Sequence, residues 1–343
     1  MAIVWSLTRR NGRFKAFRGS DQELQLEINR LSTANRAERA LERERKLLSL
    51  RHSAGLRALE AAPTGSRHVD PAFDRLPDAH GLPEIAAAEV TPELLRAGIL
   101  RDGCLLVRGL VDRRRALALA RGIQHGFDER QRSEAGEPYD QAYFEEFCAH
   151  PRYGESLEDA RPWVKEGGGI LAPDSPRLAF ELFELLHEAG LRQVVEGYLG
   201  EPALVSVHKS TLRRADPAVG GGWHQDGAFM GPVRSVNLWL SLSRCGDVSP
   251  GLDLVPRRLA QLVASGGEDT FLSYQVSQRV AEESAGEKGV IRPIFEPGDA
   301  LLFDELFLHK TGSDPDMPNP RFAVENWFFA ASAFPVEYAP LAV

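Results

Sequence analysis

Four consecutive residues, Trp223-His224-Gln225-Asp226, form the pattern with the clearest chemical meaning in this sequence. In an extended strand, residues two apart project to the same side. His224 and Asp226 can therefore offer an imidazole and a carboxylate to a single metal ion. A third ligand has to come from another segment. His309 is the best candidate, because it follows an apolar, strand-like run and precedes a turn-rich stretch.

Two histidines and one carboxylate on one face of an octahedral ion leave open coordination positions. Non-haem Fe(II) oxygenases use this arrangement to bind a co-substrate and O2. Zinc is the second candidate metal, since the same ligands with a bound water also suit hydrolysis. By itself the His-x-Asp triplet is a weak signal for a metal site, for which iron is the first candidate metal and zinc the second.

Arg321 adds a second chemical feature, because it follows His309 by twelve residues and opens the last strand-like segment. A guanidinium stays charged when it is buried, and it can bind a carboxylate through two hydrogen bonds. An oxygenase that uses 2-oxoglutarate needs such a group for the remote carboxylate of that co-substrate. Thr311, two residues after His309, could add a hydroxyl hydrogen bond. A hydrolase has no use for Arg321, so this residue favours an oxygenase.

Taken in order, the segments WHQD, GDALLFDELFLH and RFAVENWFF closely resemble the phytanoyl-CoA dioxygenase family. That family includes ectoine hydroxylase and many bacterial members. The middle element of its pattern appears here as SPGLDLVPRRL, and the resemblance covers about residues 95–335. It implies a fold that is mainly β with flanking helices, built as a double-stranded β-helix (a jelly-roll, cupin-like barrel). It also implies Fe(II) as cofactor, with 2-oxoglutarate and O2 as co-substrates.

The resemblance assigns roles to individual residues. His224, Asp226 and His309 fall on the metal ligands, which are also the catalytic residues. Arg321 falls on the arginine that pairs with the far carboxylate of 2-oxoglutarate, and Thr311 falls on a hydroxyl that assists it.

The segment VHKSTLRR resembles a strand of ectoine hydroxylase that contacts co-substrate and substrate. This alignment places Arg213 near the other end of 2-oxoglutarate and Lys209 near the substrate. Lys209, Thr211 and Arg213 share one face of the predicted strand. Farther along, Arg257-Arg258 replaces the usual Gly-Ser-His of the family, so this rim is expected to meet an acidic group of the substrate.

The implied reaction is oxidation of a small-molecule substrate, most simply its hydroxylation, with release of succinate and CO2. Halogenases of this fold replace the carboxylate ligand with a small residue, so Asp226 favours oxygen transfer over halogenation. Two alternatives stay open: a zinc-dependent hydrolase on a cupin-like barrel, and a non-catalytic barrel that binds a small molecule.

The elements that must position these residues change in character along the chain. From residue 203 onward, short strand-like runs alternate with Gly/Pro clusters, which predicts a sandwich or barrel. One run, SVNLWLSLS, places an apolar face on alternate residues. Its members are Val236, Leu238, Leu240 and Leu242. Residues 86–200 mix helical patterns with one buried strand, and residues 175–200 predict a helix that ends at Gly200.

Residues 20–60 predict one long helix or two shorter ones. Ser20 followed by Glu23 has the spacing of a capping box. Leu24, Ile28 and Leu31 then form an apolar stripe that is too short to make a core by itself. The stripe must pack on the chain's own barrel or on a second copy of the chain, and the second case would give a homodimer.

The charge distribution separates this N-terminal segment from the rest of the chain. Residues 1–60 carry 13 Lys/Arg and 7 Asp/Glu, a net charge of +6, whereas the whole chain carries -8. The remainder therefore carries -14, which argues against nucleic acid as a partner. We predict a helical extension and linker over residues 1–80 and an oxygenase domain over residues 81–343.

The composition indicates an ordinary globular chain of 343 residues, with 43% hydrophobic and 26% charged residues. No apolar run approaches the ~20 residues needed to span a bilayer, and the first residues do not resemble a secretory signal. The three cysteines, Cys104, Cys148 and Cys245, are far apart and odd in number. They argue against a disulfide framework and favour a reducing, cytoplasmic location.

Overall fold

A computed structural model describes residues 14–77, 81–267 and 269–343. Its larger sheet has the strand order β1-β2-β7-β5-β9-β4-β10, and β3 pairs with β4 outside this path. The bounds of these strands are β1 (Glu84–Ala86), β2 (Cys104–Arg108), β3 (Gly169–Leu171), β4 (Ala203–Ala215), β5 (Ser235–Ser241), β7 (Ala300–Phe303), β9 (Arg321–Ala330) and β10 (Pro340–Ala342). Among the described strands of this sheet, β1 and β2 run parallel and the other neighbouring pairs run antiparallel.

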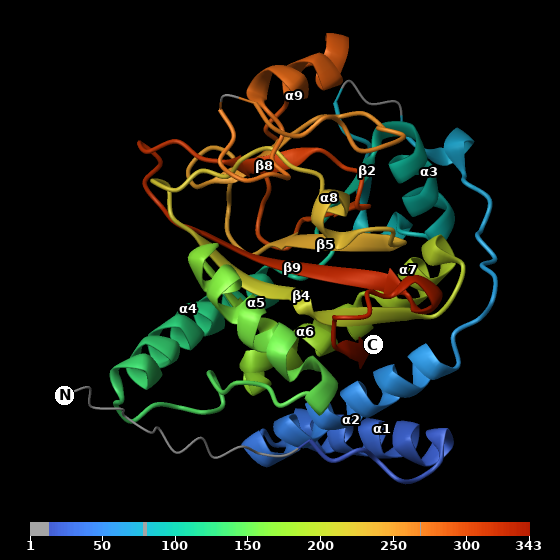
Figure 1. Ribbon diagram of the computed structural model, residues 1–343, viewed down its shortest axis with the longest axis vertical. Coiled ribbons are helices and arrows are strands. Elements are labelled where there is room, and N and C mark those ends of the chain that lie inside the picture. Colours follow the sequence, from blue (N-terminus) through green and yellow to red (C-terminus); the bar gives the residue numbers. More distant parts are fainter. Residues whose placement is uncertain (1–13, 78–80, 268) are drawn as a thin grey trace.

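A smaller layer faces one side of this sheet. It consists of β6 (Gly251–Leu254) and β8 (His309–Gly312), and isolated bridges such as His224↔His309 and Leu254↔Ile291 extend it. In Figure 1, β8 and its neighbouring loops lie above β5 and β9. The two layers enclose an interior as the two sheets of a jelly roll do, so the predicted double-stranded β-helix barrel is confirmed.

Alternation along the strands separates the barrel interior from the face that the helices cover. Leu238 and Leu240 of β5 belong to the large core beneath the helices, as the sequence predicts. Trp239, which lies between them, belongs to the interior cluster together with Phe303 and Trp327. Each strand thus presents one row of side chains to the helices and the next to the site.

Helices cover the outer face of the larger sheet, and two lie on the side of this sheet that faces β8 (Figure 1). On the outer face are α4 (Arg113–Ala135), α5 (Gly154–Glu166), α6 (Pro176–Glu188) and α7 (Leu191–Leu199), with α3 (Pro92–Asp102) beside β2. On the other side are α8 (Gly227–Met230) and α9 (Gln278–Ala285). Short 3-10 turns occupy Phe73–Arg75, Ala87–Glu89, Pro151–Tyr153, Ala172–Asp174, Gly286–Lys288 and Ala331–Ala333.

The helix predicted over residues 175–200 is divided in two. α6 ends at Glu188, and Gly190, with φ of 63°, adopts the left-handed conformation from which α7 starts. Glycine adopts this conformation without steric cost, which explains the break inside an otherwise helical pattern.

The N-terminal segment forms two helices, α1 (Asp21–Ala37) and α2 (Leu41–Glu60). The predicted capping box is present, because Glu23 N–H donates to the Ser20 hydroxyl and Ser20 N–H donates to the Glu23 carboxylate. The stripe of α1 packs with α2 and with Phe180 of α6. α2 lies along β10 and α6.

Charge complementarity joins this basic segment to the acidic body. Arg36 pairs with Glu184, Arg39 pairs with Glu181, and Arg45 pairs with Glu145. The described part of the extension therefore packs on its own chain. Within the described ranges, every helix is too short or too polar to cross a membrane.

Candidate metal centre

Two hydrogen bonds between backbones bring the separate segments of the site together. His224 N–H donates to the carbonyl of His309 at 3.0 Å, and His309 N–H donates back to the carbonyl of His224 at 3.1 Å. Of the pair His224 and Asp226, His224 lies in extended backbone, whereas Asp226 has φ of -61° and ψ of -28° and is the N-cap residue of α8. The turn after Gln225, rather than an extended strand as predicted, directs the carboxylate back toward the imidazoles.

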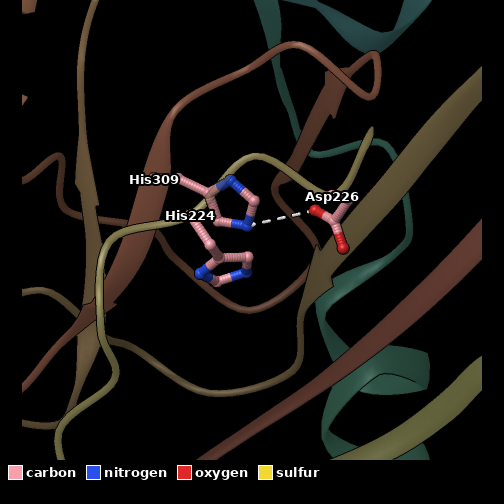
Figure 2. Close-up of side chains that lie close together, drawn as sticks. All are labelled: His224, Asp226 and His309. Atoms are coloured by element: carbon pink, nitrogen blue, oxygen red, sulfur yellow. Dashed lines mark ion pairs between the residues drawn. The ribbon is translucent and has the colours of Figure 1, made fainter. Parts of the chain in front are cut away.

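The three side chains converge on one point, as Figure 2 shows. One ligand atom from each of His224, Asp226 and His309 lies within 4.8 Å of the others. His309 Nε2 is 3.7 Å from Asp226 Oδ2, and the two imidazole ring centroids are 4.5 Å apart. This is a donor set of two imidazoles and one carboxylate, which fits a divalent first-row transition metal.

Both imidazoles are oriented in the same way. Nδ1 of His224 donates to the carbonyl of Gly222 at 2.9 Å, and Nδ1 of His309 donates to the carbonyl of Phe307 at 3.0 Å. Because each Nδ1 carries the proton, each Nε2 keeps its lone pair for a ligand.

The surroundings of His309 keep its ring uncharged. Burial lowers the pKa of His309 to about 4, and the nearby His224 contributes in the same direction. The rings of Phe303 and Phe307 lie 4.8 and 6.2 Å from the His309 ring and shield it from water. A neutral imidazole is the form that binds a metal.

Gln225 holds the loop that carries the first two side chains. Its amide Nε2 donates to the carbonyl of Leu306 at 2.6 Å, and its Oε1 accepts from Val263 N–H at 2.8 Å. The side chain therefore points away from the metal site and ties it to two neighbouring segments.

Arg321 is buried, with 4% of its surface exposed, and it is only partly hydrogen-bonded. Its Nη1 donates to the carbonyl of Gly251 at 2.9 Å, while its Nε has no partner among the described residues. The guanidinium lies over the ring of Trp239 at 5.3 Å. A buried cation with an unused donor is costly unless an anion binds to it.

Thr311 lies on the same side of the barrel as Arg321. It pairs with Leu252 in the ladder between β8 and β6, and Gly251, which accepts from Arg321, is the preceding residue of β6. The structure thus brings the guanidinium beside the strand pair that carries Thr311.

Arg213 has an acidic partner that the sequence analysis missed. Nε and Nη2 of Arg213 lie 2.8 and 2.7 Å from Glu325 Oε2, and the Thr211 hydroxyl donates to the same oxygen at 3.1 Å. Burial alone would raise the pKa of Glu325, but the charge and hydrogen bond of Arg213 lower it to about 2. The role of Arg213 toward 2-oxoglutarate stays a prediction, and its charge is already balanced by Glu325.

A signal for Glu325 was present in the sequence. In RFAVENWFF, Arg321, Ala323, Glu325 and Trp327 alternate on one face of a strand. An acidic residue on the same face as a buried arginine indicates a polar group in the barrel interior.

Lys209 lies on β4 near the metal ligands. Its Nζ is 4.2 Å from the ring centroid of Phe229, which stands 6.2 Å from the ring of His224. Burial lowers the pKa of Lys209, whereas the carboxylates of Asp226 and Glu325 act in the opposite direction. The neighbouring His208 instead stacks on Tyr338 at 5.0 Å, and its Nε2 lies 3.0 Å from the Ser156 hydroxyl.

Of Arg257 and Arg258, which were expected to meet an acidic group of the substrate, Arg258 already has an acidic partner in the protein. Arg258 forms an ion pair with the buried Asp304, which also accepts a hydrogen bond from Tyr198. Arg258 is therefore a structural cation in this fold.

Comparisons with known proteins bear on the fold. No protein-family model matches the chain, and no curated protein matches it either. Among solved structures, EctD from S. alaskensis with 2-oxoglutarate and 5-hydroxyectoine matches 78% of this chain and 84% of its own, at 18% identity and a TM-score of 0.50. AviO1 from Streptomyces viridochromogenes Tue57 matches 72% of this chain and 98% of its own, at 17% identity and a TM-score of 0.44. The chain shares the fold of EctD.

Proposed function

We propose that the protein is an Fe(II)- and 2-oxoglutarate-dependent oxygenase that hydroxylates a small-molecule substrate. The observation that carries this proposal is the pairing of two features inside one barrel. A set of two histidines and one carboxylate can hold the metal, and the incompletely bonded guanidinium of Arg321 can hold a dicarboxylate. EctD, which has the same fold, was crystallised with 2-oxoglutarate, and this supports the proposal.

His224, Asp226 and His309 would hold Fe(II) through their Nε2 and carboxylate atoms. When bound, the iron would activate O2 for oxidation of the substrate, with 2-oxoglutarate converted to succinate and CO2. Arg321, with Thr311 beside it, would bind the far carboxylate and so fix the orientation of the co-substrate. The rings of Phe303 and Phe307 pack beside the His309 ring and help to keep water from it.

Hydroxylation is the favoured outcome because Asp226 occupies the carboxylate position. A small residue there would leave room for a halide. The carboxylate fills that room, so the product is expected to carry added oxygen.

The zinc hydrolase alternative requires a general base close to a metal-bound water. Glu325, a buried carboxylate on the same barrel wall, is held ionised by Arg213, with a pKa of about 2. A group with so low a pKa is a poor proton acceptor near neutral pH. The hydrolase alternative also leaves the buried Arg321 without a role. The other alternative, a non-catalytic barrel that binds a small molecule, does not require the complete set of two histidines and one carboxylate.

The proposal is tested by loading the purified protein with Fe(II) or Zn(II) without oxygen and then adding 2-oxoglutarate and air. Fe(II)-dependent formation of succinate is expected, and a substrate screen by mass spectrometry should reveal a product with one added oxygen. The proposal would be overturned if 2-oxoglutarate bound equally well without metal and the zinc-loaded protein hydrolysed a compound of the screen.

Oligomeric state and location are separate proposals. A homodimer through the extension stays a prediction, although the stripe of Leu24, Ile28 and Leu31 is already buried within its own chain. Light scattering at micromolar concentration tests it, since a monomeric mass would contradict it. A cytoplasmic location is supported by cysteine usage, and the three cysteines are free thiols in the structure.

A further inference from the structure

Lys209 is a cation at the site for which the described residues offer no hydrogen bond or ion pair. Its contact is with the face of the Phe229 ring at 4.2 Å. The residue is half-buried, so a ligand can reach it. The ammonium group is partly desolvated and its contact is a cation–π interaction, so it can still form a charge-assisted hydrogen bond with an anion.

Apart from Arg321, three other basic residues around the barrel interior have acidic partners. Arg213 is bound to Glu325, and Arg258 is bound to Asp304. Lys310 lies 3.8 Å from Asp253 and 3.2 Å from the amide oxygen of Gln278. Among the described residues around the barrel interior, Lys209 and Arg321 carry charges that no acidic side chain pairs with.

Under the proposed function, one of these two cations is neutralised by the co-substrate and the other is not. The two positive charges of Fe(II) are offset by Asp226 and by the metal-side carboxylate of 2-oxoglutarate. The far carboxylate of 2-oxoglutarate offsets Arg321. Lys209 is left with one uncompensated positive charge beside the metal.

The surroundings of Lys209 add an apolar requirement. The ring of Phe229 meets the ring of Tyr274 edge to face at 4.9 Å, and both rings lie within 6.3 Å of the His224 ring. Phe229 is 37% exposed, so its ring is available to a ligand. A substrate held here would place an apolar or aromatic body against these rings.

We propose that Lys209 is a specificity-determining residue that binds a carboxylate of the substrate, whose apolar body lies against Phe229 and Tyr274. This inference rests on the proposed function and narrows its substrate class to apolar carboxylic acids. It places the acidic group of the substrate at Lys209 of β4 rather than at the Arg257-Arg258 rim.

The test uses three probes that share a phenyl ring and a three-carbon chain: 3-phenylpropanoate, its isosteric amide 3-phenylpropanamide, and the cationic 3-phenylpropylamine. The protein is loaded with Mn(II), a redox-stable substitute for Fe(II), and saturated with 2-oxoglutarate so that Arg321 is occupied. Calorimetric titration should show that the carboxylate binds about tenfold or more tightly than the amide, with the amine weakest. Equal binding of the carboxylate and the amide to the unmodified protein would overturn the inference without any variant.

Variants then assign the preference to one side chain. Lys209→Met should abolish the preference for the carboxylate, Lys209→Arg should keep it, and Lys209→Glu should shift it toward the amine. Arg214→Met is the matched control, because it removes one positive charge from an exposed position on the same strand. It should leave the preference unchanged.

Affinity for 2-oxoglutarate distinguishes failure of this inference from failure of the proposed function. If 2-oxoglutarate binds without any need for metal, the proposed function fails and this inference fails with it. If binding requires the metal but Lys209→Met weakens 2-oxoglutarate and keeps the discrimination between probes, Lys209 serves the co-substrate. That result would overturn the substrate assignment alone.

Discussion

Each histidine of the candidate metal centre donates its Nδ1 proton to the carbonyl two residues earlier, Gly222 for His224 and Phe307 for His309. This shared geometry fixes the tautomer of both rings before any metal binds. The site is therefore preorganised at the level of single side chains, and the cost of orienting the ligands is met during folding.

Removal of either imidazole should abolish metal binding. His224→Ala and His309→Ala are expected to lose both bound Fe(II) and succinate formation, because two remaining donors hold the ion weakly. Metal content by elemental analysis and succinate by chromatography provide the measurement. His187→Ala, at an exposed position of α6, is the control. Full iron content and turnover in both metal-site variants would contradict the assignment.

Arg321→Ala should weaken binding of 2-oxoglutarate to the metal-loaded protein by about 3–5 kcal/mol, since it leaves a buried carboxylate without its partner. Arg321→Lys should recover only part of the affinity, because an ammonium cannot form the bidentate contact. Calorimetric titration measures both, and thermal unfolding checks that the variants fold. Unchanged affinity in Arg321→Ala would refute the role of this residue.

At the scale of elements, the C-terminal segment is held by two buried histidines. His52 of α2 donates from Nδ1 to the carbonyl of Pro340 at 2.7 Å and accepts from His150 N–H at 2.9 Å. His208 of β4 accepts from Ala339 N–H at 3.1 Å. Burial lowers the pKa of His52 and of His208 to about 4.

These pKa values predict that acid weakens the fold. The unfolded chain takes up protons on His52 and His208 near pH 6.5, whereas the folded chain takes them up only near pH 4. Their stabilising contribution is therefore present above pH 6.5 and is lost as the pH falls from 6.5 toward 4. Each histidine contributes a slope of up to about 1.4 kcal/mol per pH unit in that window.

Urea unfolding of the metal-free protein at pH 7, 6 and 5 measures this slope. His52→Gln removes one of the buried histidines that titrate in this window, which in the metal-free protein also include His309. The variant should therefore show a shallower dependence on pH, whatever its stability at pH 7. An identical slope in the variant and the unmodified protein would show that His52 does not titrate as its burial requires.

At the scale of the whole molecule, the N-terminal helices and the barrel share one core. Leu48 of α2 belongs to the same buried cluster as the strands of the larger sheet, and α2 lies along β10 (Figure 1). The extension predicted over residues 1–80 is therefore packed on the barrel over its described helices. A common core predicts that both unfold together.

Leu48→Ala should lower the free energy of unfolding by about 2–5 kcal/mol within a single transition, because it opens a cavity in that shared core. Leu26→Ala, on the exposed side of α1, should have little effect, since Leu26 is 60% exposed. Chemical denaturation followed by circular dichroism and by tryptophan fluorescence gives the comparison. Two separate transitions would mean that the extension is an independent unit.

The sequence by itself determined the features that depend on neighbouring residues. The capping box of Ser20 and Glu23 follows from a spacing of three residues, and the apolar face of β5 follows from strict alternation. The candidate metal ligands were suggested locally, because His224 and Asp226 are two residues apart and His309 follows a strand signal. The turn that orients Asp226 was not predicted. The alternation of strands and turns predicted a sandwich or barrel, and the family resemblance specified the double-stranded β-helix.

Only the tertiary structure decided how the interior charges are paired. β4 changes register against β9 between Val205 and Ser210. Val205 and Leu212 both face the helices, although strict alternation over seven residues would put them on opposite faces. Counting from Val205 therefore predicts that Lys209 faces the helices, whereas counting back from Leu212 predicts that it faces the barrel interior. Strand register is set by contacts between segments distant in the chain, and a shift of one residue reverses the side chains. The pairing of Arg213 with Glu325 and the approach of Lys209 to Phe229 follow from that register and from no local pattern.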